Sequence, residues 1–207
     1  MKNVNRRQFL AATSTALAFP YVGRVLGAND KLNIGVVGVT GRGASNLKGV
    51  SGENIVALCD VSASNLAGAK KQFSNAKTYS DFRKMLEQKD LDAVVCSTPD
   101  HTHAIVGVSA LKSGRHLYCE KPLAHTVSEV RAMTEAARKH KRTTQMGNQI
   151  HSGTNYRRVV ELVQSGAIGE VKEVHVWSNA TYGKINLSPD DVPIPKGLDY
   201  DLWLGPL

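Results

Sequence analysis

The feature that most constrains the fold is a glycine-rich loop that follows a short apolar run and precedes a predicted helix. The apolar run covers residues 32–38, and the loop continues through Val39, Thr40, Gly41, Arg42 and Gly43. A strand, a tight turn and a helix in this order are typical of the first unit of a parallel α/β sheet. Glycines allow the backbone angles of the turn and let a phosphate approach the free amides at the helix N-terminus. The loop therefore predicts a nucleotide phosphate site that includes Arg42.

The spacing within this loop departs from the usual dinucleotide pattern at one position. It reads G-x-T-x-x-G, with Gly38 at the turn, Gly43 at the helix–strand contact and Thr40 in place of the middle glycine. The Thr40 hydroxyl can donate to a phosphate, and Gly41 beside it lets the backbone adjust. A shifted or weaker pyrophosphate site is equally consistent, so the loop alone is weak evidence.

A second apolar run, residues 55–59, ends in Asp60 about 20 residues after the first glycine, as a dinucleotide fingerprint requires. A carboxylate there accepts hydrogen bonds from both hydroxyls of the adenosine ribose and repels the 2′-phosphate of NADP. The following Val61 and Ser62 supply no arginine that would reverse this preference. We therefore predict NAD as the cofactor and consider NADP less favoured. The alternative is that Asp60 caps a helix beginning near Ser62.

A third apolar run, residues 91–97, leads into a polar turn and a helix predicted to extend to about residue 113. Its exit lies at the same carboxyl edge of the sheet, where ligands of open α/β sheets bind. We predict cofactor contacts from Ser97, Thr98, Pro99 and His103. His101 and His103 also suit capping or surface roles. Asp100 and His103 lack a third ligand at sensible spacing, so no metal is predicted.

The tripeptide Glu120-Lys121-Pro122 follows another apolar strand late in this alternation. Its position predicts that Lys121 lies near the nicotinamide end of a bound dinucleotide. An isolated lysine in such a turn is more often a surface residue. Proline also permits a cis Lys121–Pro122 bond, which the sequence does not decide.

Together these segments resemble the Gfo/Idh/MocA oxidoreductases, which bind NAD(P) and mostly act on sugars, cyclitols and related polyols. The resemblance rests on residues 38–43, Asp60, residues 98–103 and, above all, residues 118–123, and it extends from about residue 32 to the end. It implies a Rossmann-type parallel sheet, followed by an α+β domain with a mainly antiparallel sheet that holds the substrate pocket and often the oligomer interface.

The resemblance also implies roles for individual residues. Lys121 is expected beside the nicotinamide and the substrate hydroxyl as the catalytic residue, and Glu120 is expected to hold its loop. In the family a histidine, often four residues after an aspartate, supplies the acid/base group, but no such pair follows residue 121 here. We take Asn148, Gln149 and His151 as substrate-side candidates, with ordinary loop hydrogen bonding as the alternative.

Three regions are expected along the chain: a leader at 1–28, an NAD(P)-binding Rossmann domain at 30–150, and the beginning of a C-terminal substrate and oligomerisation domain at 151–207. In the last region, residues 155–165 read as a helix and residues 171–177 as a strand. Because the resemblance implies further strands after this one, we interpret the sequence as the amino-terminal part of a longer protein.

The leader resembles a twin-arginine export signal. Arg6 and Arg7 are followed by Phe-Leu and a weakly apolar stretch, with no acidic residue before Asp30. The apolar stretch is too short and too rich in small residues for a stable membrane span. We expect export to the periplasm, with NAD tightly bound before export. A basic leader on a cytoplasmic enzyme is the alternative.

Charge and cysteine content narrow the remaining classes. The net charge of +8 includes four basic residues of the leader, and 22 basic and 18 acidic residues remain, which does not indicate a nucleic-acid partner. The basic run at 138–142 is explained by the end of a helix that opens with a capping box at Thr126 and Glu129. Cys59, Cys96 and Cys119 fall near core strand ends, and their spacing argues against a disulfide scaffold or zinc site.

The sequence therefore predicts an NAD-dependent oxidoreductase acting on a sugar, cyclitol or related polyol, without a nucleic-acid or membrane partner once the leader is removed, and oligomeric through its C-terminal domain. A glycoside-cleaving enzyme that uses transient oxidation and a non-catalytic ligand-binding protein are the alternatives. An S-adenosylmethionine-dependent transferase is less favoured, because it leaves the Glu-Lys-Pro strand end unexplained.

Overall fold

The computed structural model describes residues 30–178 and 193–205, and the predicted leader at 1–28 lies outside the described residues. The chain divides into a unit of Met1–Lys31 and a unit of Leu32–Leu207. The features below belong to the second unit.

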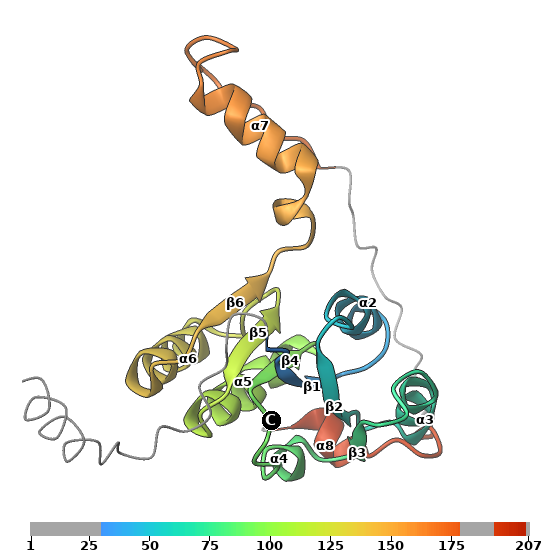
Figure 1. Cartoon of the computed structure of the whole chain (residues 1–207). Coiled ribbons are helices and arrows are strands. Elements are labelled where there is room, and N and C mark those ends of the chain that lie inside the picture. The colour runs from blue at the N-terminus through green and yellow to red at the C-terminus, as the bar shows by residue number, and fades with distance from the viewer. Residues whose placement is uncertain (1–29, 179–192, 206–207) are drawn as a thin grey trace, which may run out of the picture. The chain divides into compact units, whose positions relative to one another are not determined.

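A parallel sheet of six strands forms the centre of this unit, with the order β3-β2-β1-β4-β5-β6 (Figure 1). All neighbouring strands pair in parallel. The strands are β1 Asn33–Val37, β2 Asn54–Cys59, β3 Lys77–Tyr79, β4 Ala93–Cys96, β5 His116–Glu120 and β6 Thr144–Gly147. The chain order reverses between β1 and β4, which is where open α/β sheets of this Rossmann type bind ligands. The predicted Rossmann-type sheet is confirmed.

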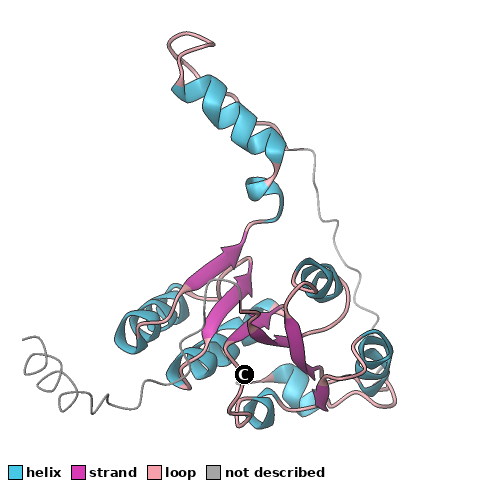
Figure 2. Cartoon of the chain, in the orientation of Figure 1, coloured by secondary structure: helices cyan, strands magenta, loops and turns pink. Residues whose placement is uncertain are grey.

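Helices cover both faces of the sheet, because successive side chains of each strand point to opposite sides. Val36 faces a core that includes Leu47 of α2 (Arg42–Gly49) and Ala69 of α3 (Ala63–Gln72). Val37 faces a second core with residues of α4 (Phe82–Met85), α5 (His103–Lys112) and α6 (Val127–His140). Burial on both faces explains why the central strands read as continuous apolar runs. Figure 2 shows the alternation of strands and helices.

Local signals placed several elements correctly. The capping box at the start of α6 is present: the Thr126 side chain accepts from the Glu129 amide, and the Glu129 carboxylate accepts from the Thr126 amide at 2.8 Å. The helix predicted at 155–165 is α7, Thr154–Gln164. The Lys121–Pro122 bond is cis.

Two short elements were missed, and one strand was predicted wrongly. β3 and α4 span only three and four residues, too few to give a recognisable period. Residues 171–178 are described without a strand, contrary to the prediction for 171–177. A strand is stabilised by pairing with a neighbour, and no described residue pairs with this segment. The proposed second domain stays a prediction.

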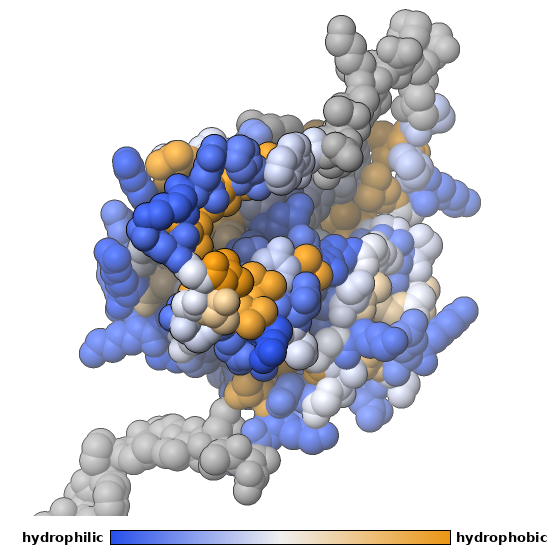
Figure 3. All heavy atoms as spheres, turned by 90° about the horizontal axis from the view of Figure 1, so that it is seen from above, coloured by the Kyte–Doolittle hydropathy of each residue, from blue (hydrophilic) through white to orange (hydrophobic). Residues whose placement is uncertain are grey.

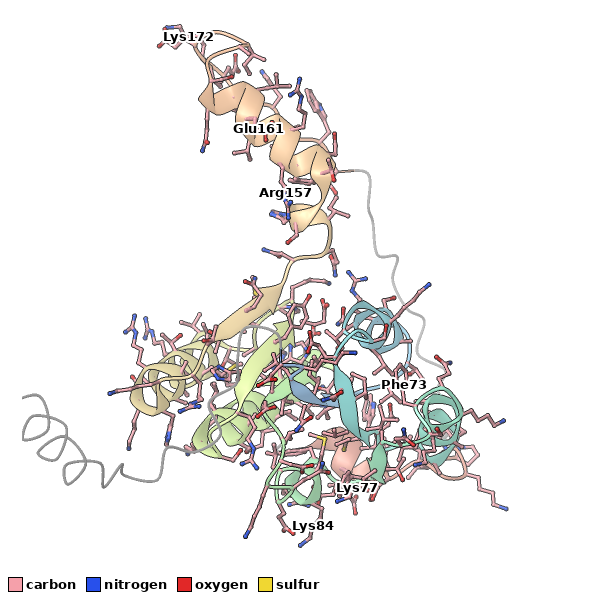
Figure 4. All side chains as sticks on the ribbon, in the orientation of Figure 1. Phe73, Lys77, Lys84, Arg157, Glu161 and Lys172 are labelled. Carbon is pink, nitrogen blue, oxygen red and sulfur yellow. The ribbon has the colours of Figure 1, made fainter. Side chains whose placement is uncertain are left out.

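Side chains of α7 and the segment after it are largely exposed, including apolar residues such as Val159, Ile168 and Trp177. Figure 3 shows hydrophobic residues in orange reaching the surface among hydrophilic ones. In Figure 4, Arg157 and Glu161 extend outward from α7, whereas Phe73 lies at the end of α3, where it packs against a core. Within the described residues, no helix has both the length and the apolarity of a membrane span.

Candidate functional site

Two cavities lie at the carboxyl edge of the sheet, where the exits of β1, β2, β4 and β5 meet. The larger measures about 710 Å³ and is bordered by Gly38, Thr40, Asp60 and Pro99, among others. The smaller measures about 440 Å³, and its lining residues are Arg42, Ser97, Thr98, Asp100, His103, Glu120, Lys121 and Gln149. Ser97 and Thr98 line both, so the cavities adjoin at the exit of β4. This arrangement suits a ligand with two ends.

The glycine loop must remain free of side chains at two positions. A Cβ on Gly38 would lie 2.4 Å from the Ser97 carbonyl oxygen, and a Cβ on Gly43 would lie 1.9 Å from the Gly38 oxygen. Gly41 has a φ of 54° and open space beside it, and it is the N-cap of α2 without a side-chain hydrogen bond to the helix amides. These amides therefore remain available to an anion. The loop has the form that a pyrophosphate requires, and the hydroxyl of exposed Thr40 accepts a bond from Asn65 at 3.3 Å.

Asp60 ties the glycine loop to the exit of β2. Its Oδ2 accepts from the Val39 amide at 3.0 Å, and its Oδ1 accepts from the Ser62 amide at 2.9 Å and from Asn65 Nδ2 at 3.2 Å. A carboxylate has about four acceptor positions, so room remains for about one further bond rather than the two expected from both ribose hydroxyls. The N-cap of α3 is Ser62, so the alternative of Asp60 as N-cap is wrong.

An arginine borders the larger cavity, although the residues next to Asp60 supply none. Arg83 reaches this wall from α4, which the sequence analysis missed. Asp81 holds its guanidinium with hydrogen bonds of 2.7 to 3.0 Å. The hydrogen bond from Arg83 lowers the pKa of Asp81 below its usual value. The arginine thus faces the adenosine-side cavity with its charge already paired.

Residues near the end of the chain also line the larger cavity. They include Leu198, Leu202 and Trp203, the last two from α8, Tyr200–Leu204. The Asp199 amide donates to the Val61 oxygen at 2.9 Å, and His101 Nε2 lies 2.8 Å from the Trp203 oxygen. This segment was predicted to belong to the second domain, and no local signal in the sequence indicates that it returns to the first.

Glu120 is the centre of a polar network at the smaller cavity. The residue is 4% exposed. Its Oε1 accepts from Asn46 Nδ2 at 2.9 Å and lies 3.4 Å from Arg42 Nε, while Oε2 accepts from Gln149 Nε2 at 3.4 Å. A Cβ on Gly147 would lie 2.7 Å from Glu120 Oε1. Glu120 therefore connects β5 to α2 and to the exit of β6, and this network holds the loop that carries the next residue.

Lys121 is exposed and lines the smaller cavity. Among the described residues, no hydrogen-bond or ion-pair partner is recorded for its ammonium group. A lysine with its backbone fixed by Glu120 on one side and Pro122 on the other, and with its charge unpaired, is available to a ligand. The prediction that it faces the site rather than bulk solvent alone agrees with this position.

His103 lines the smaller cavity, but its ring faces the protein. The residue is 1% exposed, with Nδ1 2.7 Å from the Pro122 oxygen and Nε2 2.8 Å from the Thr98 oxygen. Both nitrogens are thus occupied, and His103 shapes the cavity instead of offering a ring nitrogen to a cofactor. The neighbouring Ser97 hydroxyl accepts from Asn46 Nδ2 at 2.9 Å.

The three substrate-side candidates are separated by the fold. Gln149 borders the smaller cavity through its contact with Glu120. Asn148 is exposed and lines neither cavity. His151 stacks on Tyr156, with ring centroids 4.9 Å apart, and also lies outside both linings.

Comparison with known proteins agrees with this geometry. Residues 32–148 match the model of an oxidoreductase family with an NAD-binding Rossmann fold, named GFO_IDH_MocA. Inositol 2-dehydrogenase of Salmonella typhimurium is 33% identical over 150 residues, which are 70% of this chain and 45% of the relative. A glycosyl hydrolase family 109 protein of Shewanella pealeana is 27% identical, covering 72% of this chain and 36% of the relative.

A solved structure is similar over the same region. Scyllo-inositol dehydrogenase of Lactobacillus casei, with bound NAD(H) and scyllo-inositol, gives a TM-score of 0.64 at 26% identity, over 68% of this chain and 43% of the other. The chain spans about half the length of the curated relatives it matches, or less.

The match confirms NAD as the cofactor class and decides against an S-adenosylmethionine-dependent transferase. The open glycine loop, the acceptor position left on Asp60 and the paired cavities fit that cofactor. The chain belongs to the Gfo/Idh/MocA family of oxidoreductases and carries its NAD-binding Rossmann domain.

Proposed function

We propose that the complete protein is an NAD-dependent dehydrogenase of a cyclitol or related polyol. The observation that carries this proposal is the unpaired ammonium of Lys121 at the smaller cavity, next to the exit of β4. The relatives named as inositol dehydrogenases support the substrate class, since several of them match the same region. NAD over NADP is part of the proposal, because Asp60 opposes a 2′-phosphate.

The chemistry assigned to Lys121 follows from its charge. Bound NAD supplies a hydride acceptor, and removal of hydride from a carbinol carbon requires the hydroxyl proton to leave. A cation beside that oxygen stabilises the developing alkoxide. Lys121 orients the substrate hydroxyl and holds this charge, while Glu120 keeps the lysine loop in place through Arg42, Asn46 and Gln149. The described residues offer no assigned partner that takes the proton.

The direct test uses the full-length protein with NAD and a panel of polyols that includes myo-inositol and scyllo-inositol. We expect lasting NADH absorbance together with a ketone product from at least one cyclitol. A panel of sugars and cyclitols that gives neither reduced cofactor nor product would contradict the proposal and would favour a ligand-binding role.

A second candidate is glycoside cleavage through transient oxidation, supported by the similarity to the glycosyl hydrolase family 109 protein. The same first steps at Lys121 serve both reactions, because oxidation of a carbinol begins each of them. Incubation with a chromogenic glycoside and bound NAD distinguishes them: cleavage without net NADH accumulation supports this candidate, and net reduction supports the dehydrogenase.

We also propose that the segment containing Arg6 and Arg7 directs export by the twin-arginine route. That route carries folded proteins, so NAD would be bound before export and released slowly. Export of a reporter fused to residues 1–28, and its loss in the Arg6→Lys, Arg7→Lys double variant, is the expected result. Purified periplasmic protein without bound nucleotide would contradict tight retention.

A further inference from the structure

The hydrogen bonds of His103 constrain the protonation of its ring. Nδ1 lies 2.7 Å from the Pro122 carbonyl oxygen and Nε2 lies 2.8 Å from the Thr98 carbonyl oxygen. Carbonyl oxygens only accept, and a neutral imidazole has a single N–H to donate. In the neutral ring, one nitrogen lone pair would therefore face a carbonyl lone pair at hydrogen-bond distance. Only the imidazolium form makes both bonds.

A buried positive charge requires a compensating group, because isolated charges are costly to bury. The Sγ atoms of Cys96 and Cys119 and a ring nitrogen of His103 all lie within 4.8 Å of one another, and all three residues are buried. The hydrogen bond from Cys119, and then the charge of His103, lower the pKa of Cys96 to about 6. The hydrogen bond to Cys96 and burial raise the pKa of Cys119. Cys96 is therefore the thiol that ionises.

Other charged groups near His103 do not face its ring nitrogens. Asp100, Glu120, Lys121 and Arg42 line the same smaller cavity. Arg42 and Glu120 pair with each other at 3.4 Å. The Cys96 thiolate is thus the anion nearest the ring on the protein side, and it comes from β4, beneath the loops that His103 contacts.

The same three residues form a close group of metal-ligand types among the described residues. A metal requires a free lone pair on the imidazole. Both ring nitrogens of His103 instead face carbonyl oxygens at 2.7 and 2.8 Å. The geometry therefore favours a charge pair over a metal ligand set.

We propose that His103 is a positioning residue that acts as a buried imidazolium, with the Cys96 thiolate as its counter-ion, and that it fastens the Thr98 loop to the Lys121–Pro122 loop. The catalytic consequence rests on the proposed function of Lys121. The two hydrogen bonds hold the backbone on both sides of the point where the cavities adjoin. Loss of the charge removes one bond and releases one of these loops.

The first test observes the ring directly and needs no enzyme activity, so its failure is distinguishable from failure of the proposed function. Full-length protein labelled with ¹⁵N-histidine is studied by NMR at pH 7. We expect the His103 ring, identified by the signals lost in His103→Gln, to carry protons on both nitrogens with slow exchange. One unprotonated ring nitrogen would overturn the proposal, and the wild-type spectrum suffices for this outcome if the variant does not fold.

The second test removes the counter-ion. Cys96→Ala is expected to lower the fraction of His103 rings that carry both protons at pH 7. The matched control is Cys59→Ala, which removes another buried strand-end thiol, whose pKa is raised by burial and which therefore carries no charge. The control should leave the ring signals unchanged. An unaltered ring in Cys96→Ala, or an equal change in both variants, would contradict the thiolate pairing.

The third test connects the ring to the site. His103→Gln retains one donor and is expected to lower turnover by about 10- to 100-fold, the range of a lost charged hydrogen bond. His140→Gln, at the end of α6, is the control expected to keep full turnover. The backbone amide signals of Lys121 and Thr98 should broaden or shift in His103→Gln. Unchanged amide signals and turnover would show that the ring does not position the loops.

Discussion

The two cavities at the sheet edge are built in different ways. In the larger one, the charged groups Asp60 and Arg83 are already bonded to protein partners, and much of the wall is backbone and apolar side chains. In the smaller one, Lys121 keeps an ammonium without a recorded partner among the described residues. Paired charges recognise a ligand with little change, whereas an unpaired charge is available to a reacting group. The difference indicates that the larger cavity binds and the smaller one reacts.

The largest expected effect tests the reacting side. Lys121→Ala should lower turnover by about 10²- to 10⁴-fold, the range typical of a positioned acid or base, while NAD affinity stays within about threefold of wild type. Steady-state kinetics and calorimetric titration with NAD measure the two quantities. Lys112→Ala, at the exposed end of α5, is the control. Retained turnover in Lys121→Ala would remove the distinction between the two cavities.

The next effect tests the binding side through the glycine loop. Gly43→Ala places a Cβ 1.9 Å from the Gly38 oxygen, so the loop must move, and we expect at least about 100-fold weaker NAD binding or a clear loss of thermal stability. Gly49→Ala lies in the same helix with no atom within 4 Å of the added Cβ. That control should bind NAD normally and gain up to about 1 kcal/mol in stability. Equal behaviour of the two variants would mean that loop shape does not matter.

A smaller effect is expected at Asp60. Asp60→Asn keeps the size of the side chain but loses the charge and one acceptor, which should weaken NAD binding by about tenfold and narrow the preference for NAD over NADP. Binding titrations with both nucleotides measure the change, and the melting temperature reports any loosening of the loop bonded through Val39. NAD affinity equal to wild type would show that Asp60 is only a structural brace.

The smallest effect concerns the paired arginine. Asp81→Asn preserves the N-cap of α4 but releases Arg83 from its charge partner, so NADP affinity should rise a few-fold without loss of NAD binding. The control, Glu87→Gln, similarly weakens the ion pair of Lys84, which lies outside the cavity lining. A gain in NADP affinity with the control and not with Asp81→Asn would place the effect outside the cavity.

Much of the edge of the sheet was predictable because its signals are local. The glycine turn, the carboxylate after β2 and the Glu-Lys-Pro end of β5 each occupy a few adjacent residues, and parallel strands bring such exits to one edge. The capping box of α6 and the extent of α7 also depend on neighbouring residues. Short elements such as β3 and α4 were missed because three or four residues carry no period.

The remaining features depend on contacts between distant residues. The sequence placed His103 at the site but not the direction of its ring, which the carbonyls of Thr98 and Pro122 determine. It likewise gave no indication that Arg83 and Trp203 line the same cavity as Asp60.

By itself, the sequence determined the Rossmann-type sheet, the nucleotide class and the residues that stand at its carboxyl edge, because strand period and turn chemistry act over a few bonds. Only the tertiary structure decided which charges are paired, which acceptor positions remain free and which loops are fastened together. Those properties depend on distances of a few ångströms between side chains that the chain order separates by tens of residues, and hydrogen bonds and ion pairs form only at such distances.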